Sequence, residues 1–223
     1  MKIVCVGCSY TYGLVTRQPD YTKTYPYYLS KMFPNAEVYN LGIGAAGNML
    51  IDIILEYAIN SIKPNFVVRQ ITYPNRFFTF KKDPRNVGIE NFIRQREKNY
   101  YDFYPQSLQK HFFYWTAKAL VHSGSDYTFN QQKKIRKQFF ANYPKEIIQY
   151  LSDTAVTNSE VQLKDIPNFF FNWNNDGKYK KFDTIENVIG HNEENIHDKS
   201  NHYNATGNKK VAEYIRTQGM SNV

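Results

Sequence analysis

Cysteine is nearly absent from the 223-residue sequence, which has only Cys5 and Cys8. This excludes a small scaffold held by several disulfides and is typical of a protein from a reducing compartment. The two thiols form a C-x-x-C pattern, which also occurs in redox motifs and zinc sites. However, Cys5 falls within a predicted strand, and the five histidines offer no paired spacing that completes a zinc site. Redox or metal use is therefore a minor alternative, and we expect no cofactor and no metal.

Long apolar runs are missing as well. No segment approaches the ~20 apolar residues of a membrane helix. The short run after Lys2 ends in polar residues instead of a signal-peptide cleavage site. We expect no membrane association and a cytoplasmic protein. The composition, rich in Asn, Lys and Tyr, is similar to that of proteins from low-GC bacteria or their phages, so a virion location stays open.

Charge and aromatic content point to a folded protein with a basic surface. The formal net charge is +8, yet Lys and Arg are scattered, with the densest patches at residues 94–98 and 133–137. Solvated helix faces explain such patches better than a nucleic-acid site, which remains the alternative. The 19 Tyr and 16 Phe residues exclude general disorder. The length suits one domain over residues 1–223, and the oligomeric state cannot be predicted.

The opening stretch predicts a buried strand followed by a tight turn. The apolar run from Ile3 to Val6 is β-branched and uncharged, and Gly7 and Gly13 bracket the connection to the next element. Ser9 therefore lies at the carboxyl end of a central strand. Ligands bind at this edge in open α/β sheets, so Ser9 is a candidate nucleophile.

The rest of the chain alternates strand and helix patterns. Residues 24–33 predict a helix with Thr24 as its cap, residues 48–62 a second helix, and residues 205–218 a last one capped by Asn204. Strands are predicted at residues 37–40, 66–71 and 166–173. This order predicts an α/β fold, a three-layer α/β/α sandwich with a mainly parallel central sheet.

Residues 77–165 depart from this pattern and predict a helical insertion or lid. Helix-like stretches occur around residues 90–98, 107–122 and 131–151, the last interrupted by Pro144. His111 and His122 fall in these stretches, where a histidine is more often packed or exposed than catalytic.

Two blocks at opposite ends of the chain resemble the SGNH, or GDSL-type, hydrolase superfamily. The first is Gly7-Cys8-Ser9 followed by Gly13, with cysteine in place of the family's aspartate. The last runs from Asp198 to Gly207 and contains His202; three residues separate Asp198 from His202, where the family has two. The resemblance implies a flavodoxin-like sandwich that uses neither metal nor cofactor.

The resemblance also implies the roles of the site residues. Ser9 would be the nucleophile, His202 the base and Asp198 the group that orients the base. His191 and His197 are nearby competitors of His202, but neither is followed by the Tyr-Asn-x-x-Gly pattern that precedes the last helix.

The oxyanion hole would be formed by the N–H groups of Ser9 and Gly44 and by the side chain of Asn75. Ala45 is an alternative to Gly44, and Asn48 is an alternative to Asn75. Tyr73 and Arg76 replace the glycine and the aspartate of the family's third block. The loop also contains Gly42-x-Gly44-x-x-Gly47, a partial dinucleotide fingerprint, but no acidic residue follows at the position that would bind a ribose.

These observations predict a serine esterase that cleaves an ester through a Ser-His-Asp triad and an acyl-enzyme. The substrate would be a small-molecule or carbohydrate ester, and the family often removes O-acetyl groups from sugars. The alternative is a non-catalytic protein of the same fold. Its basic, aromatic insertion would then bind a glycan, a nucleic acid or a protein partner.

Overall fold

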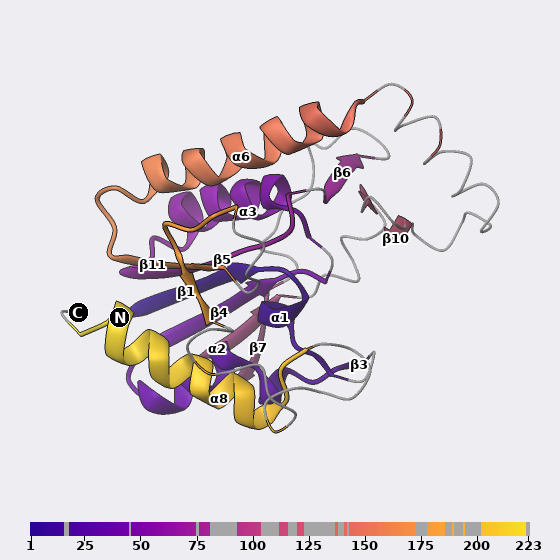
Figure 1. The fold of residues 1–223 in the computed structure, drawn as a ribbon. Coiled ribbons are helices and arrows are strands. Elements are labelled where there is room, and N and C mark those ends of the chain that lie inside the picture. Colours follow the sequence, from indigo (N-terminus) through magenta and orange to yellow (C-terminus); the bar gives the residue numbers. More distant parts are fainter. Residues whose placement is uncertain are drawn as a thin grey trace.

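The computed structural model describes residues 1–15, 18–44, 46–74, 76–80, 93–103, 112–115, 120–122, 137, 141, 143–172, 178–185, 189, 194 and 202–221. Within these ranges a seven-stranded sheet forms the centre of the molecule, in the order β12-β11-β5-β1-β4-β8-β7 (Figure 1). Every neighbouring pair is parallel except β7 and β8, which are antiparallel. The predicted, mainly parallel α/β sheet is therefore confirmed.

The central strands match the apolar runs of the sequence. The strands of the sheet are β1 (Lys2–Gly7), β4 (Glu37–Gly42), β5 (Phe66–Ile71), β7 (Ile93–Glu97), β8 (Tyr100–Phe103), β11 (Asn168–Asn172) and β12 (Asp183–Thr184). The side chains of Ile3 to Val6 are fully buried, as is every residue of β5. A strand covered on both faces needs such continuous burial.

Helices cover both faces of the sheet. The helices α3 (Asn48–Ser61) and α6 (Lys145–Gln162) lie on one face, and α2 (Tyr25–Met32) and α8 (Ala205–Tyr214) lie on the other (Figure 1). A π-helical turn, Ile215–Gly219, follows α8. This arrangement confirms the three-layer sandwich. None of the helices in the described ranges has the length and apolarity to span a bilayer.

The predicted helix caps are present. Thr24 Oγ1 accepts a hydrogen bond from the Tyr27 N–H at 3.2 Å, and Asn204 Oδ1 accepts one from the Gly207 N–H at 2.9 Å. Each cap satisfies a backbone donor that has no partner within its helix. The caps fix where α2 and α8 begin. Because α2 and α8 start at the end of the sheet where β1 stops, both begin close to Ser9.

Where the structure describes residues 77–165, the stretches predicted as helical around residues 90–98 and 107–122 contain strands, whereas residues 137 and 141 and α6 are helical. Residues 93–97 form β7, an edge strand, and a second, antiparallel sheet contains β6 (Phe77–Phe80), β9 (Phe112–Trp115) and β10 (Leu120–His122). The charges of β7 indicated a solvated helix, but an exposed edge strand carries such charges too. Pro144 lies between the helical residue 141 and α6, where the interruption was predicted, and it occupies the N-cap position of α6. His122 ends β10, and His111 lies outside the described residues.

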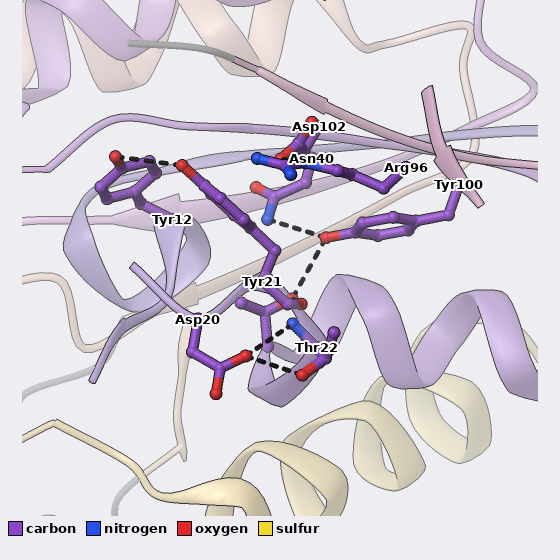
Figure 2. Close-up of polar contacts among 9 residues, drawn as sticks. Tyr12, Asp20, Tyr21, Thr22, Asn40, Arg96, Tyr100 and Asp102 are labelled. Atoms are coloured by element: carbon purple, nitrogen blue, oxygen red, sulfur yellow. Dashed lines mark hydrogen bonds and ion pairs between the residues drawn. The ribbon is translucent and has the colours of Figure 1, made fainter. Parts of the chain in front are cut away.

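The hairpin of β7 and β8 is joined to the rest of the fold by polar contacts (Figure 2). The buried Asp102 accepts a hydrogen bond from Arg96 Nε at 2.8 Å, so a charge pair links the two strands. The Tyr100 hydroxyl accepts a hydrogen bond from Asn40 Nδ2 at 3.2 Å and lies 3.3 Å from Thr24 Oγ1. Tyr100 thereby connects the edge hairpin to β4 and to the start of α2.

Four short elements of the described residues lie between β1 and α2. The single turn α1 (Ser9–Tyr12) begins directly after β1. A small ribbon of β2 (Leu14–Val15) and β3 (Gln18–Pro19) follows, and then the 3-10 turn η1 (Tyr21–Lys23). The hydroxyl of Tyr21 donates to that of Tyr12 at 3.2 Å, so η1 packs against the turn that carries Ser9 (Figure 2).

Candidate active site

Ser9 opens α1 at the carboxyl end of β1, where the sequence predicted it. Glycine allows α1 to approach the sheet closely: a Cβ on Gly42 would lie 2.3 Å from the Tyr12 backbone nitrogen, and one on Gly7 would lie 2.1 Å from Thr11 Oγ1. Beneath the turn, Gln70 Oε1 accepts hydrogen bonds from the Cys8 N–H at 3.1 Å and from Thr11 Oγ1 at 2.7 Å. The serine therefore sits on a turn that is fixed from below.

His202 lies beside Ser9 although 193 positions separate the two in sequence. Its Nε2 is 2.8 Å from the Ser9 hydroxyl oxygen, and Ser9 is only 5% exposed. His202 lies three residues before the start of α8, whose cap Asn204 fixes the end of the loop. When the imidazole is neutral with its proton on Nδ1, Nε2 accepts the hydroxyl proton. This is the geometry of a serine whose proton a base can remove.

Cys8 also contacts the serine hydroxyl, with its Sγ 3.9 Å from Ser9 Oγ. Serine has one proton, so Ser9 donates either to Cys8 Sγ or to His202 Nε2 at any one time. Burial raises the pKa of Cys8, but the charge of Arg76, the N–H of Tyr10 and the side chain of Thr72 outweigh it, and the pKa of Cys8 is lowered.

The two cysteines are free and buried, so the C-x-x-C pattern holds no disulfide. Burial raises the pKa of Cys5 far above its ordinary value, which keeps that residue a neutral thiol within β1. Among the described residues there is no cluster of three metal-ligating side chains.

The structure describes only some of the other predicted site residues. Gly44 follows the end of β4 and is partly exposed. Asp198, Asn75 and Ala45 lie outside the described residues, and so do the competing histidines 191 and 197. The predictions for Asp198 and Asn75 therefore stay predictions.

Asn48, the alternative oxyanion donor, instead has a structural role, because its side chain bonds Thr72 and Ser152. It is fully buried, and its Nδ2 donates to the Thr72 carbonyl and to Ser152 Oγ, both at 3.0 Å. Both protons of the amide are used, so Asn48 has none left to donate to an oxyanion.

Sequence reasoning missed two residues of the site. Gln70 follows Arg69 in the otherwise apolar, buried strand β5, and a polar residue in such a strand was a signal that its side chain has a specific partner. Tyr10 stacks on His202, and nothing in the local pattern distinguishes it from the other tyrosines near it in sequence.

The fold and these contacts define an α/β protein with a serine and a histidine paired at the carboxyl edge of its sheet. No family model matches the chain, and no curated protein sequence matches it significantly.

Solved structures do match. One is assigned to the G-D-S-L family of lipolytic proteins and comes from Desulfitobacterium hafniense DCB-2; it is 14% identical, covers 97% of this chain and 98% of its own, and has a TM-score of 0.43. TesA is 13% identical, with 97% of both chains covered and a TM-score of 0.45. A two-domain esterase active on acetylated mannans is 15% identical over 97% of this chain and 48% of its own, with a TM-score of 0.42.

Proposed function

We propose that the protein is a serine ester hydrolase of the SGNH type, with Ser9 as nucleophile and His202 as general base. The observation that carries this proposal is the 2.8 Å contact between Ser9 Oγ and His202 Nε2 at the carboxyl edge of the sheet. A serine hydroxyl is a poor nucleophile without a base, and this arrangement supplies one.

The reaction would proceed in two steps. Ser9 Oγ attacks the ester carbonyl while His202 Nε2 takes its proton; the imidazolium then gives that proton to the leaving alcohol as the carbon–oxygen bond breaks. Water, deprotonated by His202, next attacks the acyl-enzyme, and the proton returns to Ser9 as the acid leaves. Asp198 would orient the imidazole through Nδ1, as the resemblance implies.

The oxyanion formed in each step would be bound by the N–H groups of Ser9 and Gly44 and by the Asn75 side chain. Such donors stabilise the transition state more than the ground state, and losing one costs ~3–4 kcal/mol. The Ser9 N–H is suitably placed because amides at the start of a helical turn have no acceptor within that turn.

The substrate we propose is an ester of a small molecule or a carbohydrate, with an O-acetyl group on a sugar as the first choice. The support is the sequence resemblance to a family that often deacetylates sugars.

A fluorophosphonate tests the nucleophile without requiring the substrate, because it phosphonylates only an activated serine. We expect one adduct on the wild-type protein by intact mass, none on Ser9→Ala, and a loss of labelling rate of about 10⁴-fold in His202→Ala. Ser30→Ala is the matched control, since Ser30 is a half-buried serine on α2 that only donates to the Tyr27 carbonyl at 2.7 Å.

A folded wild-type protein that takes no adduct would contradict the proposal and turn attention to the non-catalytic alternative. An adduct that persists in Ser9→Ala would show that another residue reacts. If Ser9 is labelled, release of acetate from acetylated oligosaccharides, compared with acetylated small alcohols, tests the substrate class.

A further inference from the structure

Tyr10, the residue after Ser9, lies flat against the base. The ring centroids of Tyr10 and His202 are 4.6 Å apart and their planes differ by 26°, an offset-stacked pair. Tyr203 packs its edge against Tyr10 with a centroid distance of 5.5 Å. Tyr10 is 6% exposed, so its ring is held on one side by the histidine and is closed off from solvent.

Stacking on the face of the imidazole leaves the chemistry of its nitrogens undisturbed. The lone pair and the N–H of the ring lie in its plane, whereas Tyr10 contacts the ring from above that plane. Ser9 and Tyr10 are neighbours on the same turn, and that turn packs against Gly42 and Gln70. One rigid turn therefore positions the Ser9 hydroxyl, which loses a proton, and also sets the plane of the His202 ring, which accepts that proton.

The same contact favours the charged form of the base. An aromatic face carries negative electrostatic potential and attracts a cation placed over it. Burial raises the pKa of Tyr10 strongly, which keeps its ring a neutral phenol throughout the reaction. When His202 takes the serine proton, the imidazolium is formed against this face.

We propose that Tyr10 is a positioning residue, which holds the His202 ring in line with Ser9 and stabilises its protonated state. This inference rests on the proposed function and adds a positioning residue to the proposed Ser9, His202 and Asp198. The other titratable groups around the pair, among the described residues, are Cys8 before α1, Tyr73 and Arg76 after β5, and Tyr203. All four stay in place when only Tyr10 is changed.

The test compares Tyr10→Leu, which removes the aromatic face, with Tyr10→Phe, which keeps it. Fluorophosphonate labelling rates are measured across pH for both variants. For Tyr10→Leu we expect a fall in rate of about tenfold and a shift of the acid limb by about half to one unit towards lower pH, because the imidazolium loses its partner. For Tyr10→Phe we expect a wild-type midpoint.

Tyr39→Leu is the control for lost packing. Tyr39 on β4 stacks on Tyr101 on β8, with ring centroids 4.5 Å apart and ring planes that differ by 10°. This variant should lose stability but keep the labelling rate and midpoint.

The titration of the His202 ring, followed by NMR in wild type and Tyr10→Leu, separates this inference from the function itself. A lower midpoint in Tyr10→Leu supports the stacking role even in a protein that takes no label, in which case only the hydrolase proposal fails. Equal midpoints and equal labelling rates in wild type and Tyr10→Leu would overturn the role of Tyr10 while leaving the nucleophile established.

Discussion

Asn48 and Thr72 exchange two hydrogen bonds across the top of the sheet. The Thr72 N–H donates to Asn48 Oδ1, and Asn48 Nδ2 donates to the Thr72 carbonyl, each at 3.0 Å. Because Asn48 also donates to Ser152 on α6, one buried amide joins the start of α3, the end of β5 and α6. The loops that carry Gly44 and Arg76 adjoin this junction.

Replacing Asn48 by alanine should destabilise the protein strongly. The backbone N–H and carbonyl of Thr72 would both be buried without partners, at about 1–3 kcal/mol each. We expect the free energy of unfolding, measured in urea, to fall by about 3 kcal/mol. Asn60→Ala, an exposed change on the same helix, should have an effect below ~0.5 kcal/mol. Equal losses in the two variants would contradict this account.

Gly42→Ala should impair the site more than the fold. The new Cβ would lie 2.3 Å from the Tyr12 nitrogen and 2.6 Å from the Thr11 carbonyl carbon, so α1 must move away from the sheet. Ser9 would move with α1, and a displacement on the order of 1 Å can cost about 10²-fold in rate. We expect this loss in fluorophosphonate labelling, with cooperative thermal unfolding retained. Full labelling would mean that the turn adapts without moving Ser9.

Cys8 should make stability depend on pH. Its pKa in the folded protein is below the ordinary value of 9.0, so the folded state binds fewer protons than the unfolded state between these two values. The stability advantage of wild type over Cys8→Ser should therefore grow as pH rises towards about 9 and be lost as pH falls through the folded pKa. Urea unfolding of both proteins at several pH values measures this difference in the free energy of unfolding.

Cys5→Ser is the matched comparison, because it should show the opposite trend. Burial raises the pKa of Cys5, so its contribution is present below the unfolded pKa and is lost as pH rises above it. A difference between wild type and Cys8→Ser that does not change with pH would show that the thiol of Cys8 does not ionise in this range.

Arg96→Met should leave a buried carboxylate without its charged partner. Asp102 is fully buried, and burial already raises its pKa although Arg96 opposes the shift. We expect a loss of about 2 kcal/mol at pH ~7 and a smaller loss at pH ~4, because the raised pKa of Asp102 favours its neutral form as the pH falls. The double variant Arg96→Met/Asp102→Asn should recover most of the loss.

Lys98→Met is the control for Arg96→Met, since Lys98 is an exposed residue of the same hairpin. A loss in Arg96→Met that is equal at both pH values would indicate that the contact of the Arg96 guanidinium with the Tyr21 ring, whose centroid lies 4.8 Å from Cζ, matters more than the pairing with Asp102.

Local patterns in the sequence were enough to predict the elements around the site. The bounds of β5 and the caps Thr24 and Asn204 follow from short-range chemistry, namely an apolar run and side chains that accept a backbone proton. The approach of Ser9 and His202 is expected for loops that follow parallel strands, because those loops meet at one edge of the sheet.

Contacts between distant residues could not be predicted in this way. Arg69 lies in the run that predicted β5, yet its partner is Ser159 on α6, whose Oγ accepts from Arg69 Nε at 2.7 Å. The edge strand β7 carries charges that also suit a helix, and only its pairing with β8 decides between the two. Such contacts depend on how helices and strands pack against one another, which a short stretch of sequence does not determine.

The distance in sequence between Ser9 and His202 has a consequence during synthesis. A ribosome makes the proposed nucleophile 193 positions before the proposed base. An incomplete nascent chain therefore holds the serine without its histidine and cannot react with esters in this way. Labelling of Ser9 would thus report that a newly made chain has folded far enough to bring His202 to Ser9.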